Sequence, residues 1–236
     1  MLMKWVERIF LMVTALAAVA LTGCASISVG PVSQVEIDQM PQRVYVLPFS
    51  TVHGEFKVDR EGAELEEFKS NLQKIMVTAI STDLTKRLVP ASAAHQKHWT
   101  HPEKAWVIRG RFVRVNQGSR LLRGAIGFGL GGTKLETVVE VYDLSNLSPK
   151  PFLKFSTTGG SNAEPGAITG FATDPLTLVV EAVASGAGNV AHGVTEDTCR
   201  TAREITAELS DYMYGRGWIS EDKWIKPKQL TKPISQ

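Results

Sequence analysis

The sequence predicts an α/β (α+β) fold, in which two amphipathic helices pack on a small two-layer mixed sheet of about four to five strands. Residues 64–88 and 201–214 repeat apolar side chains at steps of three and four, which is the period of a helix with one buried face. Residues 43–49, 105–115, 133–143 and 152–158 are shorter and rich in β-branched and aromatic residues, which is typical of strands.

The composition is that of an ordinary globular protein. Of the 236 residues, 43% are hydrophobic and 21% are charged, and the formal net charge is +2. This balance indicates neither nucleic acid nor an acidic substrate, so we expect no nucleic-acid partner. The length suits one domain with appendages.

Residues 1–24 have the parts of a secretory signal. Lys4 and Arg8 form a cationic start, an apolar run follows from Ile9 to Ala20, and small residues precede Cys24. The apolar run is too short to span a bilayer. We therefore predict a signal peptide over residues 1–23.

The box Leu21-Thr22-Gly23-Cys24 resembles the signal box of bacterial lipoproteins. The resemblance implies cleavage before Cys24 and acyl chains, such as palmitate, on the mature N-terminal cysteine. The alternative is a cysteine that follows an ordinary signal by chance. In Gram-negative lipoproteins an Asp after the cysteine usually means retention in the inner membrane, whereas Ala25 stands here. The resemblance thus implies a lipid anchor in the outer membrane, on its periplasmic face.

The rest of the chain divides into three regions. We expect a tether at residues 24–41, a single α/β domain at 42–217 and a mobile C-terminal tail at 218–236. Two glycine-rich excursions, at 116–132 and 159–195, interrupt the domain.

The first strand, Arg43–Phe49, is apolar on both alternating faces, which indicates cover on both sides, and Pro48 should lie at its end. The helix over 64–88 should end before Pro90. The alternative is a helix that lies on a membrane surface, but residues 64–88 lack the dense Lys and Arg that such helices carry. Its apolar stripe comprises Leu65, Phe68, Leu72, Ile75, Met76, Ala79, Ile80, Leu84 and Leu88.

Three histidines, His95, His98 and His101, follow with Glu103 nearby. On a helix they would share a face and could bind zinc. Thr100 and Pro102 oppose a helix there, so we interpret the segment as a solvated loop and expect no metal site.

The strand Ala105–Val115 places Trp106, Ile108 and Phe112 on one face and Arg109 and Arg111 on the other. The strand Thr133–Asp143 also alternates. If the two pair as a hairpin, the arginines can lie across from Glu136 and Glu140. Phe152–Thr158 is the next expected strand.

The link between these two strands, residues 116–132, is too long for a hairpin turn and too apolar for ordinary disorder. It contains Gly127-x-Gly129-x-x-Gly132, but a strand follows where a dinucleotide site needs a helix, so no cofactor is expected. Either the tip folds over its own core, or it contacts a partner chain or the bilayer. For partner contact the candidate residues are Arg120, Arg123, Ile126, Gly127, Phe128, Gly129 and Leu130.

Several of these motifs together resemble a family of uncharacterised bacterial lipoproteins, classed as a domain of unknown function. The resemblance rests on Ile108 to Val113, Gly118-Ser119-Arg120, the core Arg123-x-x-Ile126-Gly127-Phe128-Gly129, and the strand that ends at Asp143. It covers roughly residues 43–160 and the last helix. It implies a small α/β fold and no established catalytic residues.

The last third of the chain is less regular. Leu176–Ala184 is too short to span a bilayer and suggests a short helix before a glycine-rich break, with His192 in a loop. The helix Thr201–Tyr214 buries Ala202, Ile205, Leu209, Tyr212 and Met213. Cys199 has no partner if Cys24 carries lipid, so we expect a buried inert thiol; a reactive thiol or an intermolecular bridge is the alternative.

No nucleophile elbow, paired metal-ligand motif or phosphate loop stands out, so we predict a protein that is not an enzyme, with no catalytic, cofactor-binding or metal-binding residues. We expect a membrane-anchored periplasmic lipoprotein with a binding or assembly role in the cell envelope. Its expected partner is another protein or a further copy of itself, contacted through the glycine-rich tip. The alternative is an envelope hydrolase or metal-binding protein without a recognisable motif.

Overall fold

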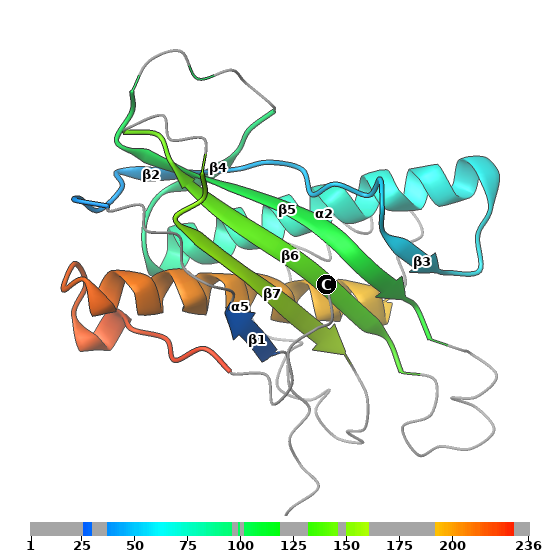
Figure 1. Ribbon diagram of the computed structural model, residues 1–236. Coiled ribbons are helices and arrows are strands. Elements are labelled where there is room, and N and C mark those ends of the chain that lie inside the picture. Colours follow the sequence, from blue (N-terminus) through cyan, green and yellow to red (C-terminus); the bar gives the residue numbers. More distant parts are fainter. Residues whose placement is uncertain are drawn as a thin grey trace, which may run out of the picture.

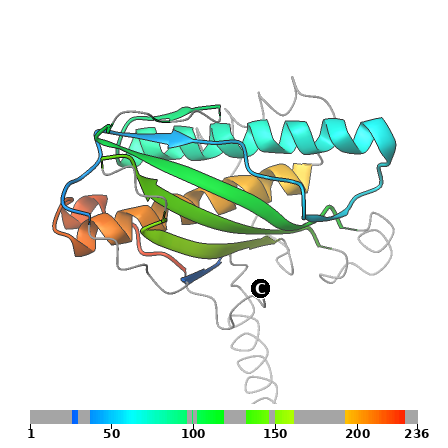
Figure 2. The same ribbon diagram turned by 45° about the horizontal axis from the view of Figure 1, so that its top comes forward.

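The computed structural model describes residues 26–29, 37–95, 99, 102–118, 132–145, 150–160 and 192–228. They form an α+β fold in which a mixed sheet carries two long helices on one side (Figures 1 and 2), as the sequence predicts. The elements, in chain order, are β1 Ser26–Val29, β2 Arg43–Val46, β3 Glu55–Lys57, α2 Gly62–Arg87, β4 Ala91–Ala93, β5 Ala105–Asn116, β6 Lys134–Asp143, β7 Leu153–Gly160, α5 His192–Gly215 and the 3-10 turn η2 Glu221–Lys223.

The sheet has the order β1-β7-β6-β5-β2-β4, and β3 also pairs with β5. Strands β5, β6 and β7 form an antiparallel meander. On the edge opposite β6, strand β5 pairs first with β2 and then, further along, with β3, and both run parallel to it. Strand β4 runs parallel to β2. The four predicted strands are confirmed. The three that the sequence did not indicate, β1, β3 and β4, have only three or four residues each, too few to show a period.

Helix α2 buries the predicted apolar stripe. Seven of its members, from Phe68 to Leu84, are at most 2% exposed, and Leu65 and Leu88 are half-buried. The helix ends at Arg87, where Lys86 and Arg87 suit the negative end of the helix dipole. Gln73 Nε2 donates to the carbonyl of Phe49 at 2.6 Å, which joins the helix to the chain beyond β2.

Helix α5 begins at His192, nine residues before the predicted start, so the interpretation of His192 as a loop residue is wrong. The reason lies in three buried threonines, Thr195, Thr198 and Thr201. They occupy buried positions in the first turns of α5, where an amphipathic helix ordinarily carries apolar side chains. The Thr198 hydroxyl donates to the carbonyl of Val194 at 2.8 Å, a partner within the helix itself.

The main core lies between the sheet and the helices and has an aromatic centre. The ring centroids of Trp106 and Phe152 lie 4.7 Å apart, and both rings pack against Tyr212 of α5. Trp218 also contacts Trp106, with 6.1 Å between ring centroids. Cys199 forms no disulfide within the described residues and is 1% exposed, so the expectation that it is buried is confirmed.

The segment after α5 packs on that helix. The amide of Ile225 donates to Ser210 Oγ at 2.9 Å, and the amide of Lys228 donates to Glu204 Oε2 at 3.0 Å. Trp224 stacks on Tyr214 with 4.9 Å between ring centroids. Residues 218–228 therefore make ordered contacts with α5. This differs from the expectation of a mobile tail that starts at residue 218.

The expected tether differs from the structure in a similar way. Ile37 is 1% exposed and belongs to the main core, and Arg216 Nη1 donates to its carbonyl at 3.3 Å. Earlier still, β1 pairs antiparallel with β7. Residues 26–29 and 37–41 thus belong to the folded part, because a short strand and one buried isoleucine leave no periodic signal in the sequence.

Candidate functional site

The face of the sheet opposite the helices, here called the open face, carries most of the charged side chains of the central strands. A small apolar cluster covers one end of it, around Leu47, Ala105, Val107 and Leu144, with Tyr45, Ala94, Trp99 and Tyr142 packed on it. Strand β2 is therefore covered on both sides, as predicted. The charged side chains begin beyond this cluster and run to the far end of the sheet.

A β-bulge in β5 determines which side chains reach the open face. Phe112 pairs with Thr137 and Arg114 pairs with Glu136, so Val113 has no opposite residue. Before the bulge the odd-numbered residues, such as Arg109, lie on the open face, and after it the even-numbered ones do. This shift corrects one sequence expectation. Arg109 does lie across from Glu140, but Glu136 faces Arg114, whereas Arg111 pairs with Val138.

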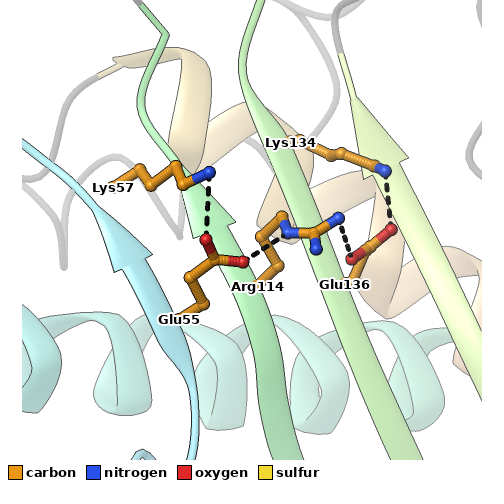
Figure 3. Close-up of polar contacts among 5 residues, drawn as sticks. All are labelled: Glu55, Lys57, Arg114, Lys134 and Glu136. Carbon is orange, nitrogen blue, oxygen red and sulfur yellow. Dashed lines mark hydrogen bonds and ion pairs between the residues drawn. The ribbon is translucent and has the colours of Figure 1, made fainter. Parts of the chain in front are cut away.

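Five side chains from three strands form a continuous ion-pair network at the far end of the open face (Figure 3). Glu55 accepts from Lys57 at 2.9 Å and from Arg114 at 2.8 Å. Arg114 also reaches Glu136 at 3.2 Å, and Lys134 lies 2.6 Å from the other Glu136 oxygen. The network therefore connects β3, β5 and β6 across their side chains.

The two carboxylates of the network have different surroundings. The hydrogen bond from Arg114, followed by that from Lys57, lowers the pKa of Glu55 below its ordinary value, and Glu55 in turn raises the pKa of Arg114. The Glu55 side chain is 45% exposed, but that of Glu136 is only 6% exposed. A buried carboxylate depends on its partners, so Glu136 relies on both of its cations.

A second row of contacts crosses the same face nearer the apolar cluster. The Arg109 guanidinium lies 4.8 Å from the centre of the Tyr142 ring, the Tyr142 hydroxyl donates to Glu140 at 2.8 Å, and Lys154 pairs with Glu140 at 3.0 Å. Burial, and then the bond to Glu140, raises the pKa of Tyr142 to about 12. Burial acts to raise the pKa of Glu140, but the bonds from Lys154 and Tyr142 outweigh it and lower that pKa.

The two ends of the glycine-rich link are fixed to the folded body. At the β5 end, Gln117 is 4% exposed, Arg60 Nη1 donates to its side chain at 2.7 Å, and its amide donates to the carbonyl of Lys57 at 3.2 Å. At the β6 end, Thr133 is 1% exposed beside Asp197 and Gly193 at the start of α5. The link therefore leaves a rigid strand pair at two anchored points.

The predicted contact residues of the link, Arg120, Arg123, Ile126, Gly127, Phe128, Gly129 and Leu130, lie outside the described residues, as does Cys24. The same is true of His98, His101 and the short helix expected at 176–184. His95 is exposed. Nowhere in the described ranges do His, Cys, Asp and Glu gather as a metal ion requires. Within the same ranges, no helix has an apolar stretch long enough to cross a bilayer.

Sequence reasoning missed a row of buried acids on α5. Burial raises the pKa of Asp197 to about 6 although Thr133 and Arg200 oppose the shift. Burial, and then the charges of Asp211 and Glu204, raises the pKa of Glu208 to about 7. Glu204 also has a raised pKa, mainly through burial. The spacing of 204 and 208 would place both on one helix face, but the sequence does not show that the segment after α5 returns to that face, where the amide of Lys228 donates to Glu204.

Comparison with known proteins gives a family and distant structural neighbours. No curated protein matches the chain. Among solved structures, the chain is similar to the PelC dodecamer from Paraburkholderia phytofirmans, with 10% identity and a TM-score of 0.32 over 76% of this chain and 98% of that one. It is also similar to the hypothetical protein CT253 from Chlamydia trachomatis, with 12% identity and a TM-score of 0.38 over 74% of this chain and 99% of that one.

One family model, described as a domain of unknown function, matches residues 31–176. That range contains the meander β5–β6–β7, helix α2 and the ion-pair network, and it is more than half of the chain. The chain therefore belongs to the DUF4410 family.

Proposed function

We propose that this protein is a membrane-anchored periplasmic lipoprotein with a non-catalytic assembly role in the cell envelope. In this proposal acyl chains on Cys24 hold it to the outer membrane, and it self-associates through residues 120–130. The signal box supports the anchor. The apolar, glycine-rich composition of the link supports the association.

The observation that carries the proposal is the way in which the link is held. Strands β5 and β6 stay paired out to Asn116 and Lys134, and the ion-pair network joins them to β3 at that end. Gln117 then joins one end of the link to Lys57 of β3 and to Arg60, and Thr133 packs the other end against Gly193 at the start of α5. A rigid mount reduces the entropy that association must overcome, which suits a segment that presents apolar side chains to another chain.

The open face supports a non-catalytic role for its own charged groups. In the network each carboxylate is held by two cations, and Glu140 is held by Lys154 and Tyr142. These bonds stabilise the ionised forms and connect neighbouring strands, which is a structural use of the charges.

The test of self-association is the size of the protein in solution. The chain without its signal and with Cys24→Ser should form a defined oligomer by light scattering. Phe128→Asp and Gly129→Val should each reduce it to a monomer with an unchanged circular dichroism spectrum. Val52→Asp is the matched control, because Val52 is an exposed apolar residue elsewhere, at 77% exposure. A monomeric parent chain, or an oligomer that survives both substitutions, contradicts the proposal.

The anchor has a separate test. Cells fed labelled palmitate should incorporate label into the protein, and Cys24→Ser should abolish the label and move the protein from the membrane fraction to the soluble fraction. Label that persists in Cys24→Ser contradicts acylation at this residue.

A further inference from the structure

The pairing of β1 with β7 limits where an anchor on Cys24 can lie. Ser26 pairs with Thr158 and Val29 pairs with Phe155, so the chain enters the sheet near the carboxyl end of β7. Cys24 precedes Ser26 by two residues, which span at most about 7 Å. A lipid on Cys24 therefore has almost no tether and must enter the bilayer beside this edge of the sheet.

One end of the sheet lies next to that point. Gly160 of β7 pairs with Lys134 of β6, Lys134 pairs with Asn116 of β5, and Asn116 pairs with Lys57 of β3. We call this row the anchored end of the sheet. Figure 1 shows β3, β5 and β7 with their arrowheads at this end, whereas α2 finishes at the opposite end, beside β4.

The anchored end is also the end with the ion-pair network. Its three cations, Lys57, Arg114 and Lys134, outnumber its two carboxylates. The Lys57 side chain is 61% exposed, Arg114 is 41% exposed and Lys134 is 34% exposed. All three side chains thus remain partly exposed while their charged groups point to the carboxylates of the network (Figure 3).

We infer that the anchored end rests on the bilayer and that Lys57 and Lys134 contact anionic lipid headgroups. The inference relies on the proposed acylation of Cys24. The acyl chains provide the affinity, so the cations need only orient the body. Each basic residue near an anionic surface favours such contact by about five-fold. The sheet then stands with β4 and the end of α2 away from the membrane.

Lysine acylation by a water-soluble reagent tests this orientation. The protein is purified from bacterial membranes, checked by mass for acyl chains at Cys24, and placed in vesicles of phosphatidylcholine with phosphatidylglycerol. Lys57 and Lys134 should react several-fold more slowly on vesicles than in detergent. Lys86, near the end of α2, and Lys223 of η2 are exposed and serve as internal controls whose rates should not change.

The outcomes separate the inference from its premise. A chain without acyl groups on Cys24 contradicts the proposed anchor itself. Suppose that Cys24 carries acyl chains but that Lys57 and Lys134 react with the reagent equally fast on vesicles and in detergent. That result overturns the orientation alone, as does protection of Lys86 in their place. Equal protection on vesicles of phosphatidylcholine only, or protection that high salt does not weaken, overturns the contact with anionic headgroups.

Discussion

Gly110 lies where β5 passes beneath the ring of Phe49. A Cβ at this position would overlap that ring, which is itself fully buried against Phe112 with 5.7 Å between ring centroids. The ring cannot move into solvent, so we expect Gly110→Ala to lower the free energy of unfolding by about 1–3 kcal/mol. Urea denaturation measures this loss. Gly215→Ala is the control, since beyond its chain neighbours and its own helix backbone nothing lies within 4 Å of the added Cβ, and stability should stay nearly unchanged.

Glu208 should make folding stability depend on pH. Its pKa rises from an ordinary 4.5 to about 7, so the folded protein binds more protons than the unfolded chain between these values. Stability should therefore fall as pH rises through this window and then level off. Asp197 and Glu204 also have raised pKa values, so Glu208→Gln should make that slope shallower rather than remove it, and should raise the free energy of unfolding by about 1–3 kcal/mol at about pH 8.

Urea denaturation across the pH range measures the Glu208 effect. Glu221→Gln is the comparison variant, because Glu221 is exposed in η2. If the parent chain and Glu208→Gln show the same dependence on pH, then Glu208 is charged in the folded protein and the prediction is wrong.

At the scale of elements, the segment after α5 should act as part of the fold. A chain that ends at residue 228 retains Trp218 in the aromatic core and the bonds from Ile225 and Lys228 to α5. A chain that ends at residue 217 loses all of them. We expect the first truncation to unfold at the temperature of the full chain and the second to lose at least about 2–4 kcal/mol. Calorimetry of the two truncations decides whether residues 218–228 are structural.

The elements also show why some features could be predicted and others could not. Helix α2 followed from its apolar period because its inner face is apolar along most of its length. Helix α5 was predicted nine residues short because buried threonines replace apolar residues in its first turns. The pairing of Arg114 with Glu136 could not be predicted, because no residue type announces the bulge beside Phe112.

At the scale of the whole molecule, the glycine-rich link should be separable from the folded body. The pairing of β5 with β6 is complete at Asn116 and Lys134, so residues 119–131 are not needed to align the strands. Replacing these residues with a short Asn-Gly turn should leave the helix content and the unfolding temperature almost unchanged while abolishing the proposed self-association. If the chain with the replaced link no longer folds, the link contributes to the stability of the core and the prediction is wrong.

The two-layer fold itself was predictable, since both long periodic helices and the four longer strands leave clear patterns. The candidate site was harder to predict from the sequence. Arg109 and Glu140 could be matched from alternation, but the network of Glu55, Arg114 and Glu136 joins strands that are up to about eighty residues apart in the chain and required the parallel addition of β3. The inference that one end of the sheet faces a membrane depended on β1, whose four residues carry no pattern.

The bulge in β5 has an evolutionary consequence. The side-chain period of a strand is two, yet Phe112 and Val115 both face the helices although they are three residues apart, because the unopposed Val113 adds one residue to β5 alone. Inserting one more residue beside Val113 would move Arg114 beneath the helices and Val115 into water, although no side chain had been replaced, whereas deleting Val113 would leave both on their present faces in a regular strand. Strand β5 should thus tolerate exchange of residue types far better than an insertion, and among relatives we expect insertions to accumulate in the link but not between positions 105 and 116.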